Sequence, residues 1–289
     1  MDISSILLLI LTGLAYGMLL FIFASGMSII FGLMNVVNLT HGTFFALGAY
    51  IAYSFMSRHY GFWTALVLSV IVIAAIGLVI ERLMLAFVYG SHDREVLVTF
   101  GLMFIAADVM KGIWGADSLT LGAPSALNST INMGEVMFPA YRLFVIFVGI
   151  ILAFILWFME NHTKTGAIIR AGVDDRVMLS ALGINVKVVF AGVFVFGAVL
   201  AGAAGVLGGP ILSIYSGMDA EVLIISLVIV VIGGLGTWKG TFIAALLVGM
   251  INTFGQMYFP SISMALVFLF MIVVLLVKPT GLFGKEVGA

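Results

Sequence analysis

The chain has 289 residues and a formal net charge of −1, and 63% of its residues are hydrophobic while only 9% are charged. A soluble domain has about 25% charged residues, so no globular core could bury this much apolar side chain, and the solvent around the chain must be lipid. The charge balance gives nucleic-acid binding no electrostatic support, and the absence of cysteine excludes disulfides and thiolate metal sites.

The apolar runs predict helices, because they are about 16–29 residues long and do not alternate apolar with polar residues. The first run has no basic residue before it and is too long for a signal peptide, so we expect it to be a retained span. The sequence therefore predicts an all-α integral membrane protein with about 8–9 transmembrane helices in a single domain over residues 1–289. The predicted spans are 6–33, 42–57, 61–83, 96–114, 139–159, 188–208, 221–236, 241–257 and 262–277.

A polar interruption, "MNVVNLTH" (34–41), follows the first span. It holds Asn35, Asn38, Thr40 and His41, and it has none of the basic residues of an ordinary cytoplasmic turn. The next apolar run, 43–56, gives only about 21 Å of helix, which reaches the far surface of a ~30 Å core only if it starts inside the membrane. We expect these four side chains to lie below the surface, where they either cap the helices or line a substrate path. No metal site is expected, because no other ligand residue is close in sequence.

Charged residues inside the fourth span are a separate candidate. Asp108 and Lys111 lie at i and i+3 on one face of the predicted helix. Intramembrane charges are often functional, but a pair with this spacing can also bond to itself. We interpret the two residues as a structural pair.

The polar segment 160–187 contains an amphipathic pattern at 166–182, "GAIIRAGVDDRVMLSAL". Ile169, Val173 and Val177 recur four residues apart and form an apolar stripe, whereas Arg170 and Asp174 lie on other faces. The predicted helix is too short and too charged to span the membrane. It either lies along the lipid interface or docks into a groove of a partner protein.

A second polar break, "GVLGGPILSIYSGMDAE" (205–221), follows the sixth span and contains Ser213, Tyr215 and Ser216. Both halves of the chain thus show a long helix, a Gly-rich polar break and a shorter helix. The two units enter the membrane from opposite sides, which predicts an inverted repeat. Corresponding breaks in inverted halves point to a transport site, although Gly-bounded turns are also common in membrane proteins.

The basic residues predict the orientation of the chain. One set of loops holds nine of them and the other holds three, Arg58, Lys111 and Arg142. Since cytoplasmic loops carry the excess of Lys and Arg, we expect the N-terminus outside and the C-terminus in the cytoplasm. The nine are Arg82, Arg94, Lys164, Arg170, Arg176, Lys187, Lys239, Lys278 and Lys285.

Four ordered blocks resemble the permease subunits of branched-chain amino acid ABC transporters, most of all the H-type (LivH-like) subunit. They are "GLMNVVNLTHGTFFALGAY", "TGAIIRAGVDDRVMLSALGINV" with the following "AGVFVFGAVLAGAAGVLGGP", "VIGGLGTWKGTFIAALLVG" and "KPTGLFG". The resemblance covers nearly the whole chain, and residues 115–138 match no motif.

The resemblance implies an inverted-repeat ABC importer permease in a bacterial inner membrane. It implies an M-type permease partner, two cytoplasmic ATP-binding subunits and an extracytoplasmic solute-binding protein. ATP and Mg²⁺ are then cofactors of the partners and not of this chain, which lacks the phosphate-binding GxxxxGK[ST] motif. It also implies that segment 160–187 couples to an ATPase through Ile169, Arg170, Val173, Asp174, Asp175, Arg176 and Met178.

The functions left open differ in substrate and in energy source. The neutral hydrogen-bonding residues of both breaks suit the zwitterion of a branched-chain amino acid, and they also suit urea, amides or small organic acids. A gradient-driven transporter or channel needs ion-coupling charges within the membrane, for which only Asp108 and Lys111 are candidates. An intramembrane enzyme needs a nucleophile and a base that converge, and His41 beside Thr40 is too little.

Overall fold

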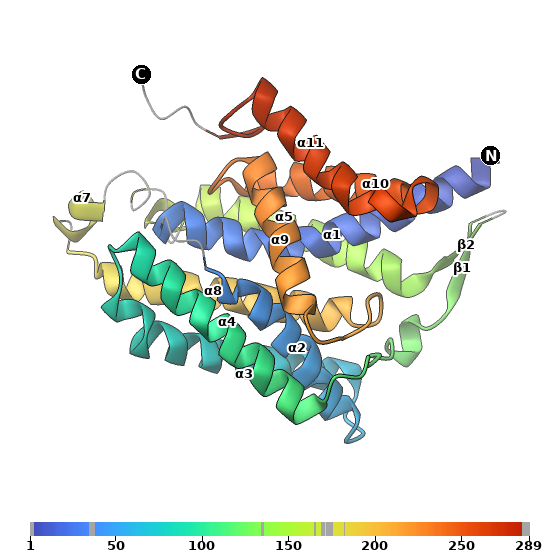
Figure 1. The fold of residues 1–289 in the computed structure, drawn as a ribbon, viewed down its shortest axis with the longest axis horizontal. Helices are drawn as coiled ribbons and strands as arrows, with labels where there is room; N and C mark the ends of the chain where they lie inside the picture. The colour runs from blue at the N-terminus through green and yellow to red at the C-terminus, as the bar shows by residue number, and fades with distance from the viewer. Residues whose placement is uncertain are drawn as a thin grey trace.

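The computed structural model describes residues 3–34, 38–133, 136–164, 166–168, 171, 176–181 and 183–284. Over these residues the chain is built mainly of α-helices, with one short β-hairpin at an end of the molecule (Figure 1). The elements are α1 (Ile3–Met34), α2 (Thr40–Met56), α3 (Phe62–Leu83), η1 (Leu85–Phe87), α4 (His92–Trp114), η2 (Ser125–Leu127), β1 (Thr130–Met133), β2 (Val136–Pro139), α5 (Ala140–His162), α7 (Arg176–Ala181), α8 (Val186–Gly208), α9 (Met218–Gly233), α10 (Trp238–Tyr258), η3 (Pro260–Ile262) and α11 (Ser263–Val277).

Each predicted span corresponds to one helix of the structure, with ends that differ by a few residues. Seven of the described helices are long and apolar enough to cross a membrane: α1, α3, α4, α5, α8, α10 and α11, the last together with η3. The helices α2 and α9 have only 17 and 16 residues, and they follow the two polar breaks. The prediction of an all-α, multi-pass membrane protein is therefore confirmed.

The start of α4 differs from the prediction. The helix begins at His92, whereas the predicted span begins at 96. Asp93 and Glu95 lie in its first turn, where negative charge is stabilised by the free N–H groups of the helix. The Glu95 carboxylate is buried and accepts a hydrogen bond from the Gly90 N–H group at 2.9 Å, so these charges belong to the helix.

The helix contacts pair off between the two halves of the chain. α1 packs along α10, and α8 packs along α3. In the same way α2 packs on α3 as α9 packs on α10, and α2 touches α4 as α9 touches α11. In Figure 1, α1 leads away from the end that carries the N-terminus, and α8 leads back towards it. Exchanging α1–α4 for α8–α11 therefore preserves these four pairs of contacts, which is the arrangement expected of an inverted repeat.

Glycine lets the central helices approach backbone to backbone. A methyl group on Gly48 of α2 would lie 2.3 Å from the carbonyl oxygen of Gly202 in α8, and one on Gly26 of α1 would lie 2.7 Å from that of Gly197. Larger residues cannot fit at either crossing. The glycine-rich composition thus brings α1, α2 and α8 into contact, as small residues do in membrane helix packing.

Residues 115–138, for which the sequence predicted no structure, form a cover at one end of the molecule. The strands β1 and β2 pair antiparallel, with Thr130 opposite Pro139. Before them, Leu119 and Ile214 exchange two backbone hydrogen bonds of 2.8 Å. Segment 115–138 is thus attached to the second break, although Leu119 and Ile214 are far apart in the sequence.

The two ends of the described chain lie apart. Figure 1 shows the start of α1 and the β-hairpin at one end of the molecule, and α7 and the loop after α11 towards the other. This is the result expected for an odd number of membrane crossings. The polar stretches 115–138 and 160–187 therefore emerge at opposite ends, as the sequence predicted.

Candidate functional site

The helix α2, which follows the first break, begins inside the molecule. His41, in the first turn of α2, lies 2.9 Å from the carbonyl oxygen of Phe23 through its Nε2 atom, and its ring stacks on the Phe23 ring. Phe23 precedes the end of α1 at Met34 by eleven residues, which is about 16 Å of helix. α2 therefore begins well below the end of α1, as the short second helix predicted.

The side chain of Asn38 holds this bend. Its Oδ1 atom accepts hydrogen bonds from the Thr40 N–H group at 3.1 Å and from the Thr40 hydroxyl at 2.5 Å. The Asn38 carbonyl also accepts from the N–H group of His41 at 3.2 Å. Such local bonds give a turn an alternative to helix hydrogen bonding, and they start α2 at Thr40 rather than near Gly42 as expected.

Other polar atoms of the same turn have no hydrogen-bond partner among the described residues. They are Asn38 Nδ2, His41 Nδ1 and Thr43 Oγ1. All three side chains are buried, with at most 3% of their surface exposed. An unpaired buried polar group costs about 1–3 kcal/mol, so each such atom needs a functional or structural reason. Asn35 lies outside the described residues.

The second break, residues 209–217 between α8 and α9, is open on its surface. Ser213 and Ser216 are exposed, and Tyr215 is half-buried. The Tyr215 hydroxyl donates a hydrogen bond to the carboxylate of Glu221 in the first turn of α9. Leu121 of the covering segment lies against Gly209.

The two short helices that follow the breaks meet in the structure. A methyl group on Gly42 would lie 2.1 Å from the carbonyl oxygen of Asp219, so the first turns of α2 and α9 are in backbone contact. Beside this contact is a niche too narrow to admit water. Its lining residues are Ala46, Tyr50, Ala107, Met110, Tyr215, Ser216, Gly217 and Asp219.

The structure thus brings Tyr215 and Ser216 together with two residues that the sequence did not assign to this site. Asp219 is an acidic residue that lies just before the predicted span 221–236. Tyr50 gave no signal, because its place depends on how α2 packs against α9. His41 adjoins Gly42 in the first turn of α2, but its ring lies against Phe23 of α1 and not in this niche.

The polar segment 160–187 is fixed at its start. The indole N–H of Trp238 in α10 donates a hydrogen bond to the Glu160 carboxylate. Thr163 closes the end of α5, since its hydroxyl donates to the Met159 carbonyl at 2.6 Å and accepts from the Gly166 N–H group at 3.1 Å. The chain therefore leaves α5 through a turn that the hydrogen bonds of Thr163 stabilise.

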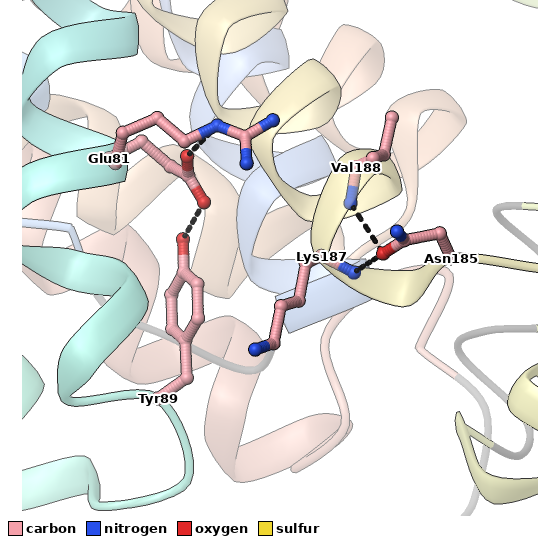
Figure 2. Close-up of polar contacts among 6 residues, drawn as sticks. Glu81, Tyr89, Asn185, Lys187 and Val188 are labelled. Carbon is pink, nitrogen blue, oxygen red and sulfur yellow. Dashed lines mark hydrogen bonds and ion pairs between the residues drawn. The ribbon is translucent and has the colours of Figure 1, made fainter.

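The end of the segment is fixed by a helix cap. The Asn185 side chain accepts hydrogen bonds from the N–H groups of Lys187 at 3.1 Å and Val188 at 3.4 Å (Figure 2). This satisfies two N–H groups that the first turn of α8 leaves free.

A buried carboxylate lies close to this cap. Glu81 of α3 is 1% exposed, accepts a hydrogen bond from the Tyr89 hydroxyl at 3.2 Å and lies 3.6 Å from the Arg82 guanidinium (Figure 2). The Tyr89 ring meets the Phe190 ring edge-on, with 5.5 Å between the two ring centroids. α3 and the start of α8 are therefore joined through Tyr89.

A sequence profile of the family described as "Branched-chain amino acid transport system / permease component" matches residues 9–277. The chain belongs to this family. It is 28% identical to the high-affinity branched-chain amino acid transport system permease protein BraD of Pseudomonas aeruginosa, over 96% of this chain and 95% of that protein. It is 26% identical to the corresponding permease protein LivH of Escherichia coli, over 94% of both chains.

The related permease protein LivM of Salmonella typhimurium is also similar, at 26% identity over 92% of this chain and 68% of that protein. Among solved structures, PsaBC from Streptococcus pneumoniae in complex with a Fab gives a TM-score of 0.47 at 14% identity, over 92% of this chain and 89% of that one. The matched relatives are named as transport permeases and not as enzymes.

In this permease the residues expected to contact an ATPase lie mostly outside the described part of the chain. These are Ile169, Arg170, Val173, Asp174 and Asp175. Arg176 and Met178 belong to α7, of which the structure describes the backbone. α7 forms the second half of the helix predicted at 166–182, and Gly183, with a φ of 79°, follows it.

The interpretation of Asp108 and Lys111 as an ion pair is wrong. Both residues are exposed on α4, and their charged groups are not within bonding distance of each other. The spacing of three residues places them on neighbouring positions of the helix, but it does not bring the two charged groups into an ion pair.

Proposed function

We propose that the chain is the transmembrane permease subunit of an ATP-driven importer for branched-chain amino acids and forms half of its translocation path. The observation that carries this proposal is the family match over residues 9–277. The relatives that span almost the whole chain, BraD and LivH, are named for branched-chain amino acid transport. Transport of urea, amides or small organic acids by the same kind of importer is the alternative, and these names favour it less.

The path is proposed to run where the two short helices that follow the breaks meet. Gly42 and Asp219 touch there, and half-helices that start inside a membrane protein direct their N–H groups at a bound substrate. The polar groups offered are Asn35, Asn38, Thr40 and His41 from the first break and Ser213, Tyr215 and Ser216 from the second. The unpaired atoms of Asn38 and His41 support this role, because a polar substrate or water would satisfy them when the path opens.

The partners follow from the function. The similarity to LivM supports a second, related permease subunit as the other half of the path. An importer of this kind also needs two cytoplasmic ATP-binding subunits, which hold ATP and Mg²⁺, and a solute-binding protein outside. Segment 160–187 is proposed to dock on an ATPase subunit through Ile169, Arg170, Val173, Asp174, Asp175, Arg176 and Met178.

The proposed location is the bacterial inner membrane, with the N-terminus outside. The excess of basic residues in the loops near α7 and the C-terminus supports this orientation, because cytoplasmic loops retain Lys and Arg.

Reconstitution tests the proposal directly. The complete complex in proteoliposomes, with ATP inside and the solute-binding protein outside, is expected to accumulate radiolabelled leucine. Complexes without ATP or without the binding protein are the controls and should not accumulate it. Leucine uptake by this chain alone, without ATP, would show a gradient-driven transporter and would overturn the proposal.

Substitution of the docking surface tests the proposed coupling role. Asp174→Ala and Arg176→Ala should leave membrane insertion intact and lower leucine uptake relative to ATP hydrolysis. Lys187→Ala, on an exposed position at the far end of the segment, is the control. Unchanged uptake in both test variants would remove these residues from the ATPase interface.

A further inference from the structure

We propose that the hydrogen bond between Glu160 and Trp238 transmits movement of segment 160–187 to the first break, by way of the turn 233–238 between α9 and α10. The inference rests on the proposed function, because it needs segment 160–187 to receive movement from an ATPase subunit. It assigns Glu160 and Trp238 as positioning residues, which act on the path without touching the substrate.

The bond joins two elements that are distant in the chain. Glu160 lies in the last turn of α5, where segment 160–187 begins, and Trp238 is the first residue of α10. Both side chains are partly buried, and the acceptor is a carboxylate. Hydrogen bonds to a charged group are about twice as strong as neutral ones, so this bond can carry a displacement without breaking.

The turn that Trp238 ends is internally fixed. Gly234 and Gly236 have φ angles of 99° and 77°, values that favour glycine. The Gly234 carbonyl accepts hydrogen bonds from the Thr237 N–H group at 3.1 Å and from the Thr237 hydroxyl at 2.8 Å. A pull on Trp238 therefore moves the whole turn rather than unwinding it.

The turn lies directly against the end of α1. A methyl group on Gly32 would lie 2.8 Å from the Cα atom of Gly236, and one on Gly236 would lie 2.7 Å from the Cα atom of Gly32. The two backbones touch with no side chain between them, so a shift of the turn displaces Gly32. α1 ends two residues later at Met34, and the first break follows.

The opposite side of the turn is closed by the C-terminal part of the chain. The N–H groups of Leu282 and Phe283 donate to the carbonyl groups of Ile232 at 2.8 Å and Gly233 at 3.0 Å. The turn is thus held between α1 and residues 282–283. Because packed elements have few alternative positions, the turn passes a displacement on and does not absorb it.

The two ends of segment 160–187 are therefore connected to different breaks. Its end continues covalently through the Asn185 cap into α8, which leads to the second break (Figure 2). Its start reaches the first break through Glu160, Trp238 and Gly236. A single movement of the segment can in this way act on both halves of the inverted repeat.

The first test compares indole variants in the reconstituted complex. Trp238→Phe removes the N–H donor and keeps an aromatic ring, and it should lower leucine uptake per ATP hydrolysed by about three- to tenfold, the range expected for one lost hydrogen bond. Trp63→Phe is the control, because its side chain is 49% exposed at the start of α3. It should leave that ratio unchanged.

The acceptor is tested in the same assay. Glu160→Ala should reproduce the loss, whereas Glu160→Gln, whose amide oxygen still accepts from the indole, should retain most of the coupling. The double variant Glu160→Ala/Trp238→Phe should be no worse than either single variant, because all three remove the same bond. If the loss of coupling in the double variant equalled the product of the two single losses, the two residues would act independently, which would contradict their acting through one bond.

A distance measurement tests the link without relying on transport. The chain has no cysteine, so spin labels can be placed at Lys164→Cys and Leu235→Cys, both on exposed positions. If Glu160 and Trp238 hold the two elements together, the label distance should be the same with and without ATP. It should become ATP-dependent in Trp238→Phe. An ATP-dependent distance in the chain with Trp238 intact overturns the inference.

The outcomes separate the two proposals. A wild-type complex without ATP-dependent leucine uptake overturns the proposed function and the inference with it. A wild-type complex that transports leucine, combined with a Trp238→Phe variant that couples equally well and keeps a constant label distance, overturns the inference alone.

Discussion

The two breaks occupy corresponding places in the inverted repeat, yet their surroundings differ. In the first, Asn38, Thr40 and His41 are at most 1% exposed and bond to nearby backbone. In the second, Ser213 and Ser216 are exposed, and a separate segment covers the backbone through Ile214. The repeat therefore reproduces the arrangement of the helices. The side chains and inserted segments of each half determine whether the polar side chains of its break are buried or exposed.

This difference indicates that the two breaks have different roles. The first break holds a bend in the interior of the chain and retains unpaired polar atoms. The second presents hydroxyl groups on the surface, where a partner subunit or substrate can reach them. Four predictions test this comparison.

The largest effect is expected where α2 and α9 touch. Gly42→Ala places a methyl group 2.1 Å from the Asp219 carbonyl oxygen, so α2 and α9 must separate. Overpacking of this kind costs about 1–3 kcal/mol, and we expect a lower Tm in detergent together with loss of leucine uptake. Gly61→Ala is the control, because nothing lies within 4 Å of the added group. A Gly42→Ala protein with normal Tm and uptake would show that the contact is dispensable.

The first break is tested by Asn38→Ala and His41→Ala. Loss of the Asn38 turn should lower the free energy of unfolding by about 1 kcal/mol, and loss of the buried His41 ring by about 2 kcal/mol or more. Uptake should be measured per correctly folded molecule, using size-exclusion chromatography to count the folded fraction. Uptake that falls further than the folded fraction indicates a path role, whereas a parallel fall indicates capping alone.

A smaller effect on stability is expected in the second break. Tyr215→Phe removes the hydroxyl that bonds to Glu221, and at this half-buried position the expected loss is about 0.5–1.5 kcal/mol. Since the residue lines the region where α2 and α9 meet, we expect a raised KM for leucine uptake with nearly normal Tm. Tyr60→Phe, on the exposed loop after α2, serves as the control. An unchanged KM would assign Tyr215 to packing.

The smallest effect is expected on α4. Asp108→Asn and Lys111→Gln remove charges that are exposed and not paired with each other, so stability should change by less than about 0.5 kcal/mol. Leucine uptake should remain normal and independent of an imposed ion gradient. Loss of uptake in either variant, with dependence on the gradient, would favour a gradient-driven mechanism over ATP coupling.

Much of the fold could be predicted from the sequence, because a lipid solvent makes long apolar runs into helices. The positions of α2 and α9 followed from the shortness of the runs after each break. The start of α4 was not predicted, because acidic residues such as Asp93 and Glu95 occur both in loops and in the first turn of a helix.

The candidate site was predictable only in part. The polar character of Asn38, His41 and Tyr215 marks the breaks in the sequence. Their contacts do not follow from it: the bond from His41 to Phe23, the meeting of Gly42 with Asp219 and the inclusion of Tyr50 depend on helix packing. The β-hairpin was missed for the same reason, since its segment attaches to Ile214, far away in the chain.

The attachment of Leu119 to Ile214 uses main-chain atoms only. Such a contact requires that the two backbones stay in register and makes almost no demand on which side chains they carry. The side chains of Leu121 and Phe138 in the same stretch are buried, so these two positions are also constrained in composition. For protein engineering, exposed hairpin positions such as Met137 are suitable for labels, whereas deletions between Gly115 and Leu119 should detach the cover from the second break.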